Sequence, residues 1–111
     1  MWLLDVNVDI RLRQALYELG IKAESAVTLG WRELTNGKLV AAAYAAGFRV
    51  LITRDRLFSS AASHVISKHP DVAIVIMTLP QRPYLAYQQS FKEAWAKSPI
   101  VPKGGAVITW P

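Results

Sequence analysis

Short apolar segments alternate with segments of helical periodicity along this chain. Runs of apolar and β-branched residues stand at 1–4, 50–53 and 72–77, and none of them alternates with polar residues. A strand that is apolar without alternation is buried on both faces, as in parallel sheets covered by helices. The pattern therefore predicts an α/β fold: a three-layer sandwich with a mostly parallel sheet of four or five strands and helices on both faces.

The expected elements follow from periodicity and from helix start and stop signals. Asp9 can cap the first helix, and Gly20 and Gly47 can end the first and second. A chain of 111 residues forms one hydrophobic core, so we expect a single domain over 1–111. The predicted strands are 1–4, a weaker one around Ala26–Val27, 48–53, 72–77 and 106–110; the predicted helices are 9–20, 35–47, 60–68 and 84–97.

Composition excludes several classes of function. The sequence has no cysteine, which excludes disulfides, thiolate nucleophiles and Cys-based zinc sites. No apolar run reaches the roughly 20 residues of a membrane span, and Asp5 and Asp9 stand where a secretory signal would carry Lys or Arg. We therefore expect a cytoplasmic protein without a membrane segment.

The net charge points to a polyanionic or acidic partner. Thirteen Lys and Arg against eight Asp and Glu give a formal charge of 13 − 8 = +5. Such a charge attracts nucleic acid, although a surface evenly covered with Lys and Arg gives the same sum. Arg11, Arg54 and Arg56 lie close in sequence to two aspartates that follow strands, so we expect them to contact RNA phosphates.

Those aspartates are the strongest functional signal. Asp5 follows the apolar run 1–4, and Asp55 follows the run 50–53. If the two strands are neighbours in a parallel sheet, both carboxylates converge on the crevice where open α/β folds bind ligands. Two hard oxygen donors at one place suggest a divalent metal ion. The bland alternatives are that Asp5 only ends a strand and that Asp55 forms a surface ion pair with Arg54 or Arg56.

Three segments resemble a known family. The opening Leu3-Leu4-Asp5-Val6-Asn7, the helix end at 15–20 and the segment 47–55 followed by Phe58 resemble the small toxin-associated PIN-like proteins. Members of that family open with Leu-hydrophobic-Asp-Glu-Asn, and later carry a hydrophobic run that ends in Thr-x-Asp-x-Asp-Phe. The resemblance covers residues 1–60 and is only general beyond them.

The resemblance implies a PIN-type fold and a metal-dependent ribonuclease, the toxin of a toxin–antitoxin pair. Asp5 and Asp55 would then be catalytic ligands of Mg²⁺ or Mn²⁺, with RNA, an antitoxin protein and a second copy of the chain as partners. Asn7, Asp9 and Asn36 would support the metal ligands or contact substrate. The chain departs from the family at three usually acidic positions, which hold Val6, Asn36 and Leu57.

Two further hypotheses stay open. The missing acids allow a PIN-like module that binds RNA or a partner without cleaving. A receiver-like domain would use Asp55 as phosphoacceptor with Thr78 and Lys103, but Val6 replaces an acid it needs and Lys103 precedes its strand.

Local roles also compete with function at single residues. Asp9 and Asn36 also read as helix caps, and Asn7 as a turn former. Trp31 lies in a predicted loop, and we expect it to be exposed, where it would stack on a base or anchor a partner.

Overall fold

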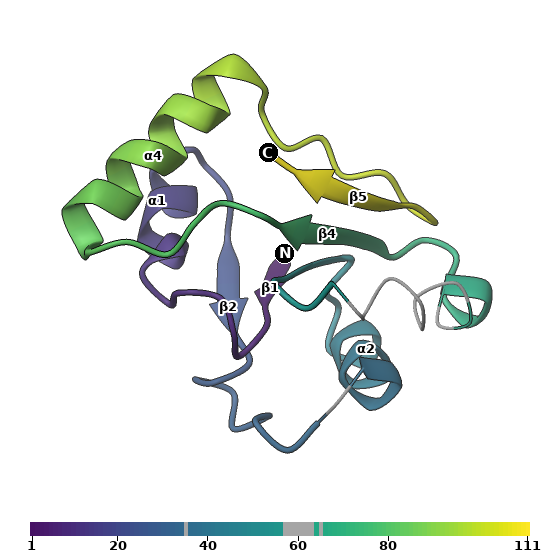
Figure 1. The fold of residues 1–111 in the computed structure, drawn as a ribbon. Coiled ribbons are helices and arrows are strands. Elements are labelled where there is room, and N and C mark those ends of the chain that lie inside the picture. The colour runs from purple at the N-terminus through teal and green to yellow at the C-terminus, as the bar shows by residue number, and fades with distance from the viewer. Residues whose placement is uncertain (35, 57–63, 65) are drawn as a thin grey trace.

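Five parallel strands form one sheet in the order β2-β1-β3-β4-β5. The computed structural model describes residues 1–34, 36–56, 64 and 66–111, and its ribbon is drawn in Figure 1. The α/β class and the parallel sheet predicted from the sequence are confirmed. The strands are β1 (Trp2–Leu4), β2 (Ala23–Ser25), β3 (Val50–Thr53), β4 (Ala73–Met77) and β5 (Val107–Trp110).

Helices cover both faces of this sheet. The described helices are α1 (Leu12–Glu18), α2 (Asn36–Ala45) and α4 (Tyr84–Lys97). Residues 64 and 66–68 are also helical, and the rest of the helix predicted for 60–68 lies outside the described residues. The observed bounds of α4 match the predicted helix 84–97, and Gly47 follows α2 with a φ of 94°, the left-handed conformation that ends many helices.

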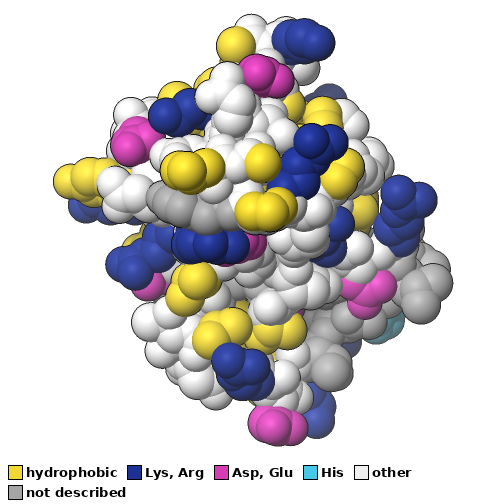
Figure 2. Space-filling view, turned by 60° about the vertical axis from the view of Figure 1, so that its left-hand side comes forward, with side chains coloured by type: hydrophobic (Ala, Val, Ile, Leu, Met, Phe, Trp, Pro, Cys, Tyr) yellow, Lys and Arg dark blue, Asp and Glu magenta, His cyan; other side chains and the backbone are white. Residues whose placement is uncertain are grey.

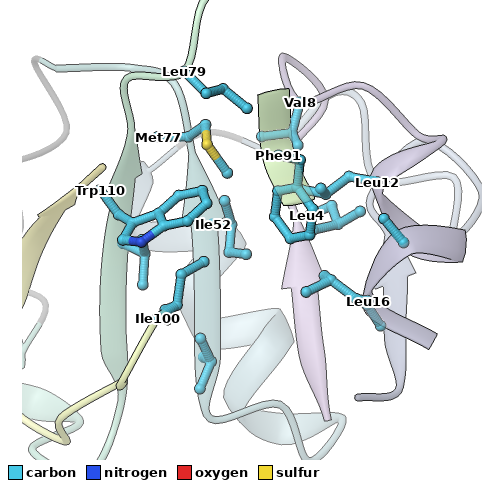
Figure 3. Close-up of a cluster of buried hydrophobic side chains, with 14 of the residues drawn as sticks. Leu4, Val8, Leu12, Leu16, Ile52, Met77, Leu79, Phe91, Ile100 and Trp110 are labelled. Carbon is cyan, nitrogen blue, oxygen red and sulfur yellow. The ribbon is translucent and has the colours of Figure 1, made fainter. Parts of the chain in front are cut away.

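Successive residues of a strand face opposite sides of the sheet, and so pack into two separate hydrophobic clusters. Leu4 and Ile52 face α1 and α4, where their cluster includes Leu16 and Phe91 (Figure 3). Leu3 and Leu51 face the other side and pack with residues of α2 such as Leu39. This two-sided burial is why the strands are apolar throughout rather than alternating.

The second strand differs from its prediction. It spans Ala23–Ser25 and not the neighbourhood of Ala26–Val27. Ser25 ends it, because the Ser25 hydroxyl accepts the N–H of Val27 at 3.1 Å and turns the chain. Ala26 is fully buried although it lies beyond the strand, so its apolar character reports core packing rather than strand structure.

The first helix begins later than its prediction. Its regular part starts at Leu12 rather than near Asp9. The N–H of Leu12 donates to the Asp9 carbonyl at 3.0 Å and that of Arg13 to the Ile10 carbonyl at 3.1 Å, which are the three-residue steps of a tighter turn. The Asp9 carboxylate accepts the N–H of Arg11 at 2.9 Å, which turns the chain just before the helix. The N-cap position is Arg11 and no side-chain hydrogen bond caps the helix there, so the prediction that Asp9 caps it is wrong.

Two glycines with similar backbone conformations allow a stability prediction. Gly105 has a φ of 80°, and a Cβ placed there would lie 2.9 Å from the Pro70 carbonyl oxygen. Gly20 has a φ of 81°, and a Cβ there would meet nothing within 4 Å. Both alanine variants should lose about 1 kcal/mol from left-handed strain, and Gly105→Ala should lose at least about 1 kcal/mol more from the clash. Urea unfolding measures the loss of stability in both variants. Equal losses would show that the backbone at Pro70 moves away from the added Cβ at no cost.

Candidate functional site at the switch point of the sheet

Asp5 and Asp55 lie at the ends of neighbouring strands. The chain passes from β1 to β2, which pairs with one flank of β1, and later to β3, which pairs with the other flank. The order of the strands therefore reverses between β1 and β3, and open α/β sheets bind ligands at this switch point. Leu4 pairs with Ile52, so Asp5 follows β1 beside the end of β3. The structure thus meets the condition on which the sequence argument depended, that these two strands are parallel neighbours.

Thr53 connects the two aspartate positions. Its hydroxyl donates to Asp5 Oδ2 at 2.7 Å and accepts the backbone N–H of Asp55 at 3.1 Å. Thr53 is fully buried and Asp5 is only 8% exposed, so this hydrogen bond is shielded from water. The other oxygen, Asp5 Oδ1, accepts the N–H of Val6 at 2.7 Å. Together these contacts fix the orientation of the Asp5 carboxylate.

Sequence reasoning missed Thr53 as a site residue. The available signal was a hydroxyl at the last position of a doubly buried strand, directly before the segment with Asp55. A buried hydroxyl needs a hydrogen-bond partner, and the end of the neighbouring strand supplies one.

Asn7 ties the loop after β1 to the segment after β3. Its Oδ1 accepts the backbone N–H of Arg54 at 3.0 Å, and its Nδ2 lies 3.5 Å from the Thr53 hydroxyl oxygen. The Asn7 side chain thus holds the backbone next to Asp55. This position agrees with a supporting role beside the two carboxylates.

The three arginines assigned to phosphate contact differ in their environment. Arg54 donates to the Leu79 carbonyl and so connects the segment after β3 to the loop after β4. Arg11 forms a two-pronged ion pair with Asp9, with contacts from 2.7 to 3.2 Å. Those hydrogen bonds hold the pKa of the Asp9 carboxyl below its ordinary value. Arg56 follows Asp55 and is exposed.

Basic side chains do not form a single patch on the face drawn in Figure 2. Lys and Arg side chains there are interspersed with acidic and hydrophobic ones. The overall charge of +5 is therefore weaker support for an RNA-binding surface than the two arginines at the end of β3.

The remaining predicted positions lie elsewhere or outside the described residues. Trp31 is half-buried and packs edge-on against Phe48, with ring centroids 6.2 Å apart, which corrects the expectation of an exposed loop tryptophan. It anchors the loop before α2 because an indole gains more from this core than from water. Asn36 begins α2, but its side chain is not described, and Leu57 is outside the described residues.

The two carboxylates are the candidate ligands of a magnesium or manganese ion. Among the described residues, no three His, Asp or Glu side chains gather at one place. Each Asp5 oxygen accepts one hydrogen bond, which leaves a lone pair on each. Mg²⁺ keeps several waters and is often held by one or two carboxylates plus substrate phosphates. Two carboxylates are as many as an ion of that kind needs from the protein, and too few for a cage made wholly of protein ligands.

Two hollows of the surface lie away from the aspartates. One of about 600 Å³ is bordered by α1 and β2, with Ile10 and Tyr17 in its wall. Another of about 300 Å³ lies between α1 and α4, with Phe91 and Trp95 in its wall. Neither is lined by Asp5 or Asp55. The aspartates are singled out by strand topology and hydrogen bonding rather than by the size of a hollow.

Comparisons of the chain with protein-family models, with curated proteins and with solved structures gave no match. Within the described part of the chain, no helix has the length and apolar character needed to cross a membrane.

Proposed function

We propose that the chain is a divalent-metal-dependent ribonuclease that acts at Asp5 and Asp55. The observation that carries the proposal is the buried Thr53 hydroxyl, which bonds to the Asp5 carboxylate and to the Asp55 backbone at the switch point. Asp5 is only 8% exposed at the carboxyl end of an interior strand. Burying a carboxylate costs solvation free energy, and fixing it for a ligand is a physical reason to retain it.

Each residue has a part in this proposal. Asp5 and Asp55 would hold Mg²⁺ or Mn²⁺, which would supply a bound water of lowered pKa and neutralise charge on the phosphate. Thr53 and the Val6 N–H keep the Asp5 carboxylate in one orientation. Asn7 holds the backbone at Arg54, and Arg54 and Arg56 attract the RNA backbone electrostatically.

The family-level part of the proposal rests on the resemblance of residues 1–60 to PIN-like proteins. It assigns the chain a PIN-like fold and the toxin role in a cytoplasmic toxin–antitoxin pair, with an antitoxin or a second copy of the chain as protein partners. The parallel sheet and the acidic strand ends support it.

A second candidate is a PIN-like module that binds RNA or a partner protein without cleaving. It is favoured by the shortage of carboxylates in the described chain, because hard cations bind more weakly as the number of charged oxygen ligands falls. Val6, at a usually acidic position, is 40% exposed beside Asp5 and offers no oxygen from its side chain.

The receiver-like alternative loses support from topology. Thr78 follows β4 and so lies at the carboxyl ends of the strands, as Asp55 does. Lys103 precedes β5, and since all strands are parallel, it lies at their amino ends. A lysine there cannot contact a phosphate on Asp55.

Metal dependence of RNA cleavage tests the proposal. We expect the purified chain to cleave single-stranded RNA in the presence of Mg²⁺ or Mn²⁺, and EDTA to abolish cleavage. RNA binding without cleavage under every metal condition would instead identify the non-cleaving module. Calorimetry with each metal ion, without RNA, separates a failure to bind metal from a failure to cleave.

A further inference from the structure

The two outer strands of the sheet differ in what their free edges bond to. Every second residue of an outer strand directs its N–H and C=O away from the sheet. The Lys22 carbonyl faces β1, so the carbonyls of Ala23 and Ser25 in β2 face outward. Arg13 Nε donates to the Ala23 carbonyl at 3.0 Å. The Leu29 N–H donates to the Ser25 carbonyl at 3.0 Å, so another strand cannot pair with β2 without displacing these donors.

The outer edge of β5 is open. The carbonyls of Ala106 and Trp110 accept N–H groups from β4 and from the residue after it, at 3.0 and 2.7 Å. Val107 and Thr109 therefore direct their N–H and C=O groups outward, where no described residue bonds to them. The strand has no charged residue and no proline, which commonly protect an outer strand from pairing.

The segment between α4 and β5 contacts one face of the sheet. The Ser98 carbonyl accepts Trp110 Nε1 at 2.7 Å, and the Ile100 side chain is buried in the cluster on the α4 side. Thr109 is exposed, and Val107 and Ile108 are half-buried. Figure 1 shows β5, with the C-terminus, at the margin of the sheet. Its edge is therefore accessible to a further strand.

We propose that β5 pairs antiparallel with β5 of a second copy of the chain, about a two-fold axis at Ile108. Residues that direct both backbone groups outward form the hydrogen-bonded pairs of an antiparallel ladder. Val107 then lies opposite Thr109 of the partner subunit, and Thr109 lies opposite Val107 of the partner subunit. Each pair exchanges both of its N–H···O=C bonds, so every outward group of β5 is satisfied. This pairing needs neither RNA nor metal and so stands apart from the proposed function.

The side chains of β5 suit this self-pairing. Ile108 packs on the α4 side of the sheet and Val107 on the other side. The two-fold axis therefore brings Ile108 beside Ile108 of the partner subunit, and Val107 beside Thr109 of the partner subunit, which are favourable β-branched pairs. No charged side chain of the strand meets a like charge. Because the β2 edge is closed, the assembly ends at two copies.

The short contact makes the dimer weak. The ladder cannot extend in either direction, because the Gly105 N–H is bonded to the Val72 carbonyl at 2.9 Å and Pro111 has no N–H. Stable interfaces bury about 1,200–2,000 Å², and two paired strands of four residues bury less. We therefore expect a dissociation constant of about 10–100 μM.

Sedimentation equilibrium of the full chain tests the dimer, and Thr109→Pro is the variant. Proline removes an outward N–H that has no partner in the single chain, and it is tolerated at the outer edge of a sheet. The variant should dimerise at least about tenfold more weakly, with a nearly unchanged unfolding midpoint in dilute solution. A native chain that stays monomeric up to about 1 mM, well above the expected dissociation constant, would overturn the proposal. Open-ended polymers would contradict the closed β2 edge.

Single cysteines test the register, because the chain has no cysteine of its own. Ile108→Cys places two thiols in a pair whose Cα atoms lie about 4.5 Å apart, within disulfide range. Thr109→Cys is the matched control, because its two Cα atoms would lie about 8 Å apart, beyond that range. With an added oxidant, Ile108→Cys should give a covalent dimer on a non-reducing gel and Thr109→Cys should not. Equal cross-linking of the two variants, or none with Ile108→Cys, would refute the pairing even if Thr109→Pro fails to fold.

Discussion

Asp55→Asn is expected to lower metal-dependent RNA cleavage by at least about 100-fold, because the change removes one of two charged metal ligands. The variant should fold normally. Its backbone N–H still donates to Thr53, and an amide has nearly the shape of a carboxylate. Cleavage of a labelled RNA over a range of Mg²⁺ and Mn²⁺ concentrations measures the effect, and thermal unfolding confirms the fold.

The matched control is Asp71→Asn. Asp71 precedes β4 and so lies at the amino ends of the strands, away from Asp5 and Asp55. Its exposed carboxylate forms an ion pair with Arg49 at 3.1 Å. Its variant should cleave RNA at the normal rate. Asp5→Asn should match Asp55→Asn in activity. Full activity in either site variant, or equal losses in the site and control variants, would refute the assignment of the carboxylate pair.

Phe91→Ala is expected to produce the largest loss of stability, about 3–5 kcal/mol in the free energy of unfolding. Phe91 is fully buried in α4 and lies 5.7 Å from the Trp95 ring and 5.5 Å from the Trp110 ring, measured between centroids. Removing its ring opens a cavity between α4 and β5 and ends both aromatic contacts. Urea unfolding followed by tryptophan fluorescence measures the change.

Leu85→Ala provides the comparison within the same helix. Leu85 is 76% exposed, so its truncation should change the free energy of unfolding by less than about 0.5 kcal/mol. A small loss in Phe91→Ala would mean that α4 does not dock on the sheet as described.

Local pattern was enough for the elements with strong periodicity. The α4 prediction was accurate because a long helix repeats its signal over several turns. The β4 prediction was accurate to within one residue because its apolar run is uninterrupted. The prediction for β2 was misplaced because three residues carry too little pattern to separate a strand from a buried turn at Ala26. The start of α1 was misplaced for a similar reason, since a tight turn and a regular helix place apolar residues alike.

The sequence by itself determined the fold class, most element positions and the two aspartates that follow strands, because these depend on residues close together in the chain. Only the tertiary structure decided that β1 lies beside β3, that the Thr53 hydroxyl reaches Asp5 across 48 positions, and that Trp31 is half-buried. It also decided that the Tyr87 hydroxyl has no hydrogen-bond partner among the described residues. Those facts depend on the pairing of distant strands and the docking of helices on them. Hydrogen bonds and burial between such distant segments leave no periodic trace in a single sequence.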